Sequence, residues 1–151
     1  MKNLSYQILR LNANTWHKAI ESTYVYEKDE FGFVHYKYSK RIPHFEEIQN
    51  VNASINDYTK EYEGDFYEDL NRIQQEHGYN IERYVSKEPT IYEILEVIFD
   101  FGGMHYIEPT VCSYDIIKLG DEYYFCESSG WVKITKLEPL NGEKLNENII
   151  L

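Results

Sequence analysis

Apolar residues recur at two different spacings along the chain, and the change of spacing divides it into strands and helices. LSYQILRL (residues 4–11) alternates apolar and polar positions, which predicts a strand. NTWHKAIES (residues 14–22) then predicts a short helix, with Asn14 or Thr15 available to cap it. The chain is therefore expected to begin with a strand followed by a helix.

From Phe45 onward the apolar residues are three or four positions apart. This spacing continues to Ile73 and predicts an amphipathic helical region over residues 45–77. Gly64 lies inside the pattern and costs about 1 kcal/mol in a helix interior, so the region is either one long helix or two helices that divide near residues 62–65. The apolar positions are Phe45, Ile48, Val51, Ile55, Tyr58, Tyr62, Phe66, Leu70 and Ile73.

A second helix is predicted in EPTIYEILEVIFDFGG (residues 88–103). Thr90 and Glu93 have the spacing of a capping box, in which each side chain binds a backbone N–H left free at the helix start. Gly102 and Gly103 mark the helix end. Because apolar residues cover most of its surface, we expect the helix at 90–101 to be central, and a short extended piece at 80–85 to precede it.

The C-terminal segment CSYDIIKLGDEYYFCESSGWVKITKL (residues 112–137) predicts three antiparallel strands. Two-residue turns at Gly120-Asp121 and Ser129-Gly130 would join them. The resulting register places one apolar face against the helix at 90–101, formed by Tyr114, Ile116, Tyr123, Phe125, Val132 and Ile134. It also pairs Cys126 with Asp115 and Lys133 and turns Cys112 to the opposite face, which disfavours a disulfide.

Residues 23–40 predict a β-hairpin in which aromatic and β-branched residues alternate around a turn at residues 29–32. Aromatic rings beside cations can hold single-stranded nucleic acid; alternatively, one aromatic face belongs to the core and the lysines protect the strand edges. The negative charge of the remaining chain opposes nucleic-acid binding. The residues concerned are Tyr24, Tyr26, Phe31, Phe33, Tyr36 and Tyr38, with Lys28, Lys37, Lys40 and Arg41.

The composition is that of one folded domain spanning residues 1–151. Hydrophobic residues make up 42% of the 151 positions and charged residues 27%, with no repeat and no linker rich in Pro, Gly or Ser. We expect an α+β fold, in which an antiparallel sheet combines the C-terminal three-stranded meander with N-terminal strands and packs against two to four helices. With no apolar run suited to a signal peptide or a membrane span, and with only two cysteines, a cytoplasmic protein is expected.

No catalytic or cofactor motif accompanies this fold. The histidines His17, His35, His44, His77 and His105 lie in five separate segments without metal-ligand spacing, and no glycine-rich phosphate loop occurs. A nucleophile at Cys126 would need a histidine that the sequence does not place beside it. We therefore expect no catalytic residue, no cofactor and no metal.

Negative charge is the strongest compositional signal. The net charge is -11, and residues 45–100 alone contribute -10, with 14 acidic and 4 basic residues. EYEGDFYEDL (residues 61–70) holds five carboxylates and no cation. On a helix these would form an acidic flank beside the apolar stripe. The candidate partner-binding residues are Asp57, Glu61, Asp65, Tyr67, Glu68 and Asp69; the alternative is an ordinary solvated helix face.

The sequence thus predicts a non-enzymatic acidic protein that binds a basic protein partner, with no membrane or direct nucleic-acid contact. Inhibitors of nucleases or of nucleic-acid-handling complexes, such as phage counter-defence or toxin-immunity proteins, have this character. Two alternatives stay open: a small-molecule or nucleotide-binding protein with a tyrosine-lined pocket, and a small hydrolase. The partner's identity and the oligomeric state do not follow from the sequence.

Overall fold

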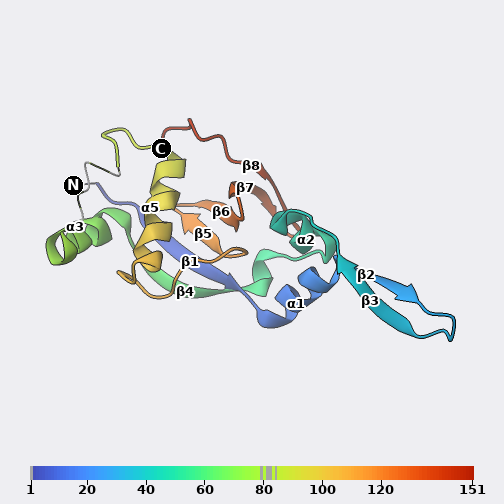
Figure 1. Cartoon of the computed structure of the whole chain (residues 1–151). Coiled ribbons are helices and arrows are strands. Elements are labelled where there is room, and N and C mark those ends of the chain that lie inside the picture. The colour runs from blue at the N-terminus through green and yellow to red at the C-terminus, as the bar shows by residue number, and fades with distance from the viewer. Residues whose placement is uncertain (1, 79, 81–82, 84) are drawn as a thin grey trace.

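Two antiparallel sheets and four helices form the described part of the chain, residues 2–78, 80, 83 and 85–151, in the computed structural model (Figure 1). The strands are β1 (Ser5–Leu11), β2 (Tyr24–Lys28), β3 (Val34–Ser39), β4 (Tyr58–Asp65), β5 (Ile116–Leu119), β6 (Glu122–Glu127), β7 (Gly130–Leu137) and β8 (Leu140–Lys144). The helices are α1 (Ala13–Glu21), α2 (His44–Asn50), α3 (Phe66–His77) and α5 (Ile91–Gly103), with a 3-10 turn η1 (Ile55–Asp57). The predicted α+β class with antiparallel sheets is confirmed.

The larger sheet has the strand order β4-β1-β5-β6-β7-β8, so the N-terminal strand pairs with the C-terminal meander. Helices cover both faces of this sheet. On one face, α3 and α5 pack against Tyr6, Ile8, Tyr124 and Trp131; on the other, α1 and α2 pack against Leu9, Leu11, Ile116, Phe125 and Ile134. Figure 1 shows α5 lying across the strands. The smaller sheet, β2-β3, projects away from this layered body.

The meander follows the predicted alternation, but its apolar face packs elsewhere. Ile116, Phe125 and Ile134 do share a face, yet that face lies against α1 and α2 rather than α5. The reason is that β6 is apolar on both sides, and α5 takes the other side, with Tyr124 and Cys126. The second turn is also displaced by one residue: Glu127 pairs with Gly130, so Cys126 lies opposite Trp131 and not Lys133.

Two helix caps differ from their predicted form. Asn12, rather than Asn14 or Thr15, caps α1 by accepting the N–H of Thr15. Thr90 caps α5 as predicted by accepting the N–H of Glu93, but the Glu93 carboxylate binds Ser86 instead of completing the box. Three of the six positions of the predicted extended piece at 80–85, namely 81, 82 and 84, lie outside the described residues.

The predicted helical region at 45–77 is the main error. Only its ends are helical, as α2 and α3; the middle is η1 and the edge strand β4. In β4, a bulge leaves Glu61 between the pairs Ile8–Tyr62 and Leu9–Lys60. Because of this extra residue, Tyr58 and Tyr62 reach opposite cores although four positions separate them. Apolar residues four positions apart are also typical of a helix, which is why the sequence pattern predicted one here.

Candidate functional site

The candidate acidic residues do not form a helical flank, because their carboxylates belong to three different elements, η1, β4 and α3. Asp57 ends η1, where its carboxylate accepts the N–H of Ser54 at 2.8 Å and the hydroxyl of Thr15 at 3.1 Å. Asp65 is the N-cap of α3: it accepts the N–H groups of Tyr67 and Glu68, and its second oxygen accepts the N–H of Leu4 at 2.7 Å. Both carboxylates stabilise the fold.

Asp69 points inward from α3 and organises two tyrosines. Its Oδ2 accepts the hydroxyl of Tyr6 at 2.6 Å and that of Tyr62 at 2.8 Å. Burial, followed by the hydrogen bond to Asp69, raises the pKa of the Tyr6 hydroxyl far above its usual value, so Tyr6 remains a donor. Gly64 lies against this cluster, and a Cβ there would come within 2.6 Å of the Asp69 carboxylate. Gly64 is therefore needed for close packing and does not divide two helices.

The other three candidate residues are Glu61, Glu68 and Tyr67, of which the two glutamates are exposed and the tyrosine is half-buried. Glu61 is exposed at the β4 bulge and Glu68 in the first turn of α3, and neither forms a hydrogen bond or ion pair through its side chain within the described residues. Tyr67 is half-buried, with the Lys2 ammonium 5.9 Å from its ring centre. These side chains do not amount to a preformed acidic docking surface.

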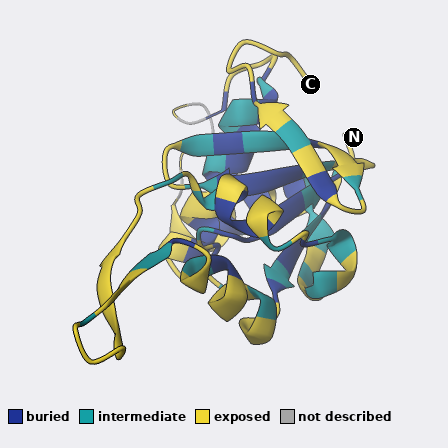
Figure 2. Cartoon of the chain, turned by 90° about the vertical axis from the view of Figure 1, so that its right-hand side faces the viewer, coloured by how far each residue is buried: buried dark blue, intermediate teal, exposed yellow. Residues whose placement is uncertain are grey.

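A projecting hairpin, here called the arm (residues 24–41), is the most exposed feature of the molecule. It combines β2, β3 and the residues around them, all of which the structure describes, and none of them is buried. Figure 1 shows it extending from the end of the body near α1 and α2, and Figure 2 shows that most of it is exposed. Its large apolar side chains in contact with water are Tyr26 (52% exposed), Phe31 (76%), Phe33 (68%), Val34 (57%), Tyr36 (56%) and Tyr38 (51%). The hairpin was correctly predicted, but the alternative in which one face joins the core is wrong.

The arm has an aromatic cluster on one face and paired charges elsewhere. The rings of Tyr24 and Tyr36 are 5.0 Å apart, and Tyr26 completes the cluster at 6.1 Å from Tyr36. Lys37 pairs with Glu27 across the strands. The arm therefore presents rings on a small sheet that has no second layer.

The tip of the arm is held in one shape by Asp29. One Asp29 carboxylate oxygen accepts the N–H groups of Phe31 and Phe33, each at 2.9 Å, and the other lies 2.7 Å from His35 Nε2. The hydrogen bond with His35, together with these backbone donors, lowers the pKa of Asp29. Gly32 takes a positive φ of 83° within the turn. Both phenylalanines are thus presented on a defined loop.

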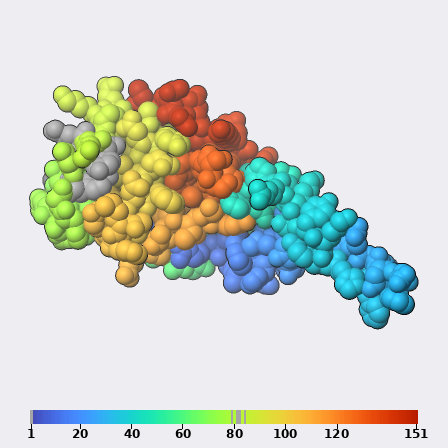
Figure 3. Space-filling view, in the orientation of Figure 1, coloured from blue at the N-terminus to red at the C-terminus, as the bar shows by residue number. Residues whose placement is uncertain are grey.

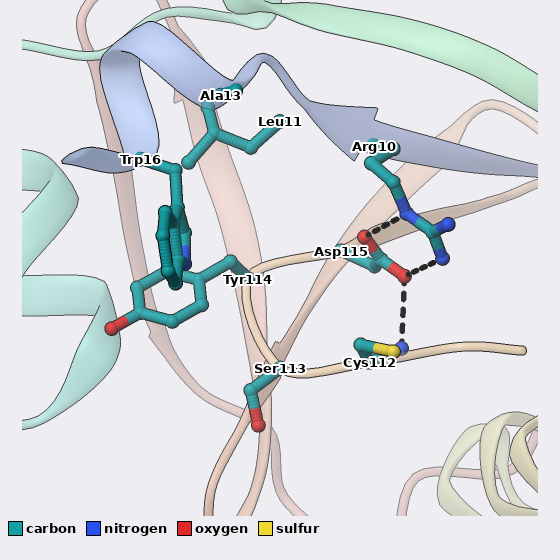
Figure 4. A pocket seen from close by; sticks show the side chains of 8 residues that line it. All are labelled: Arg10, Leu11, Ala13, Trp16, Cys112, Ser113, Tyr114 and Asp115. Carbon is teal, nitrogen blue, oxygen red and sulfur yellow. Dashed lines mark hydrogen bonds and ion pairs between the residues drawn. The ribbon is translucent and has the colours of Figure 1, made fainter.

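Four cavities on the described surface have volumes from about 260 to about 450 Å³, and none of these four is lined by more than one tyrosine. The smallest lies beside Trp16 and Tyr114 (Figure 4). Arg10 binds the buried Asp115 there with both Nε and one terminal nitrogen. Burial raises the pKa of Asp115 although Arg10 and a backbone N–H favour its charged form. Because the arginine and the carboxylate satisfy each other, this pocket offers little net charge to a ligand.

The two cysteines differ in their surroundings, Cys126 being buried and Cys112 exposed. Burial raises the pKa of Cys126 to about 12, which makes it a poor nucleophile, whereas Cys112 is free and exposed. Within the described ranges, no three His, Cys, Asp or Glu side chains converge as a metal site would require. None of the helices in those ranges is both long and apolar enough to cross a membrane.

The arm is the surface that sequence reasoning undervalued. Alternation of aromatic residues correctly indicated pairing between two strands, but it cannot show whether a second layer covers the pair. The signal that could have indicated exposure is the tip, where Phe31 and Phe33 flank Gly32 in the turn itself, a position that rarely reaches a core.

Comparison of the chain with protein-family models, with curated proteins and with solved structures found no match in any of the three.

Proposed function

We propose that the protein is a non-enzymatic binding protein that acts in the cytoplasm on a protein partner with a basic surface. The observation that supports this is the division of charge between the arm and the body. The arm carries four basic and three acidic residues, a net charge of +1, so the remaining residues carry -12. A field of this sign attracts basic surfaces and repels nucleic acid.

Exposed carboxylates on the body supply the contacts. Several have no hydrogen bond or ion pair through their side chains within the described residues, so each can meet a cation of the partner. They are Glu61, Glu68, Asp100, Glu108, Asp121 and Glu122. A partner whose basic surface normally holds nucleic acid would be blocked when bound here. Inhibition of a nuclease or another nucleic-acid-handling protein, as in counter-defence or toxin immunity, is the function we assign to such binding.

The test compares loss of local carboxylates with an equal change of net charge elsewhere. Glu61→Gln with Glu68→Gln removes two exposed acids whose side chains form no hydrogen bond or ion pair within the described residues, and Asn14→Lys with Thr135→Lys changes the net charge by the same amount at other exposed positions. The partner is captured from a lysate of the producing cell with the unaltered protein, identified, and titrated against both variants. We expect the glutamine variant to bind about 2- to 30-fold more weakly, since exposed ion pairs contribute roughly 0.2–1 kcal/mol each and two are lost.

Salt provides the second readout. Binding should weaken steeply between 50 and 300 mM salt, because exposed charges are screened over about 10 Å at 0.1 M. A captured partner with an acidic contact surface, or an affinity independent of salt, would contradict the proposal. Asp65 and Asp69 are left unchanged in every variant because they stabilise α3 and Tyr6.

A further inference from the structure

The arm lacks the second layer that a two-stranded sheet needs. An isolated hairpin is marginally stable in water and gains stability by packing its apolar face. Six large apolar side chains of the arm are each more than half exposed. At about 200 Å² for a full aromatic side chain, they leave roughly 600 Å² of apolar surface uncovered on one arm. Two arms together reach about 1,200 Å², above the roughly 1,000 Å² expected of a specific interface.

The unpaired charges of the arm show which surface would cover it. Glu27 is engaged by Lys37, and Asp29 is engaged by His35. Lys28, Lys40 and Arg41 have no ion pair among the described residues, and Glu30 is the single acidic side chain of the arm in that condition. The arm therefore fits an apolar groove on an acidic protein rather than on a basic one.

The body of this same chain contains such a groove next to the root of the arm. A cavity of about 450 Å³ lies between α2 and strands β6–β8, with Phe45 and Val132 among its apolar walls. Glu46 and Glu127 line it with one lysine, Lys144. Pro43, two residues beyond the arm, also lines it, and Figure 3 shows α2 beside the C-terminal strands at the point where the arm leaves the body.

The length and direction of the arm decide which copy can fill this groove. The five residues of β2 span about 17 Å at 3.3 Å per residue. The tip of an arm that extends away from its own body cannot reach the groove at its own root (Figures 1 and 3). If two arms lie antiparallel, however, each tip reaches the root of the other, which is the self-complementary arrangement that a two-fold axis requires.

We propose that two copies of the chain exchange arms, with Phe31 and Phe33 of each copy seated in the groove beside Phe45 and Val132 of the other. The loop held by Asp29 limits the entropy lost on docking, because both phenylalanines are already positioned. Lys28, next to the tip of each arm, then faces the acidic body of the other copy, and Lys40 and Arg41 at the root face the other copy's tip, which carries Glu30. This dimer does not depend on the proposed basic partner, which would bind elsewhere on the body.

Sedimentation velocity of the full chain from 1 to 100 µM tests the dimer. A dimer that grows with concentration is expected, and Phe31→Ser with Phe33→Ser should weaken it at least 10-fold. The melting temperature of the monomer should not change, since both side chains are exposed, and it is compared at 1 µM, where the dimer is least populated. Met104→Ser removes a large apolar side chain that is also more than half exposed but lies outside the arm and the groove, and should leave the dimer unchanged. A monomer at 100 µM, or a dimer insensitive to the arm substitutions, overturns the proposal.

Cross-linking tests the site. In a Cys112→Ser background, copies with Glu30→Cys at the tip are mixed with differently tagged copies with Gln49→Cys at the groove, and are oxidised. We expect a disulfide between the two kinds of copy, and none when Met104→Cys replaces Gln49→Cys. Equal cross-linking to position 104, or cross-linking only between two tips, rules out docking in this groove.

Discussion

Replacing Asp69 by alanine should lower the free energy of unfolding far more than replacing its neighbour Glu68 by alanine. Both residues lie in the first turn of α3, so the change in interaction with the helix dipole is similar for the two, about 0.3–1 kcal/mol. They differ in what they touch. Asp69 accepts two tyrosine hydroxyls, whereas Glu68 is exposed and its side chain accepts none. Comparing the two variants therefore separates the effect of losing the Asp69 hydrogen bonds from the effect of losing one negative charge.

The magnitude follows from the burial of Tyr6. Its side chain is 1% exposed, so without Asp69 its hydroxyl would lose a hydrogen bond to a charged acceptor, a contribution of about 1.5–3 kcal/mol, and water could not replace it. Tyr62 is half-buried and its hydroxyl can bind water instead, which limits its share. We expect Asp69→Ala to lower the free energy of unfolding by about 3 kcal/mol and Glu68→Ala by less than about 1 kcal/mol.

Urea denaturation followed by circular dichroism measures both values, and a double-mutant cycle with Tyr6→Phe identifies the contact. Because Tyr6→Phe removes the donor, Asp69→Ala should cost at least 1 kcal/mol less in that background. Equal effects of Asp69→Ala and Glu68→Ala would refute the reasoning, as would strict additivity with Tyr6→Phe.

Three further outcomes follow from the same structure. Gly64→Ala should destabilise the protein by about 1–3 kcal/mol in urea denaturation, since its Cβ would meet the Asp69 carboxylate; an unchanged midpoint would contradict that packing. Arg10→Met should cost about 3 kcal/mol by leaving the buried Asp115 unpaired, and adding Asp115→Asn should recover part of the loss; no recovery would show that the charge is not the cause. A thiol reagent at neutral pH should modify Cys112 and spare Cys126 until unfolding. Burial raises the pKa of Cys126 from 9.0 to about 12, so above pH 9 the unfolded chain loses the thiol proton before the folded chain does. The free energy of unfolding should therefore fall as the pH rises above 9, and it should fall less steeply in the Cys126→Ala variant.

Local patterns predicted the strands and helices that local interactions determine. The alternation in residues 116–127 and the cap at Thr90 survive in the fold because each depends on neighbours a few positions away. The identity of β4 depends instead on pairing with β1, some 50 residues earlier, and on a bulge that no local spacing shows. The spacing of Tyr58 and Tyr62 fits a helix equally well, so the sequence alone could not separate the two structures.

The candidate site changed for a related reason. A count of carboxylates does not show which of them the chain itself will bind, and Asp57, Asp65 and Asp69 are bound by N–H or hydroxyl donors of the protein. The arm was recognised as a hairpin, but its exposure depends on the absence of any element above it. Absence of a covering layer is a property of the whole fold.

Hydrogen bonding of these carboxylates does not remove their charge. The formal charge of -12 on the body counts every carboxylate, but the body offers fewer side chains for direct contact than the sequence suggested. Long-range attraction and short-range contact are therefore separate properties of this surface. In the proposed complex, attraction would set the rate of association, whereas carboxylates that the partner buries, such as Glu61 or Glu68, would set the rate of dissociation. A basic partner should thus associate quickly at low salt and dissociate at a rate that depends little on salt, and its hold on the body should depend on few carboxylates.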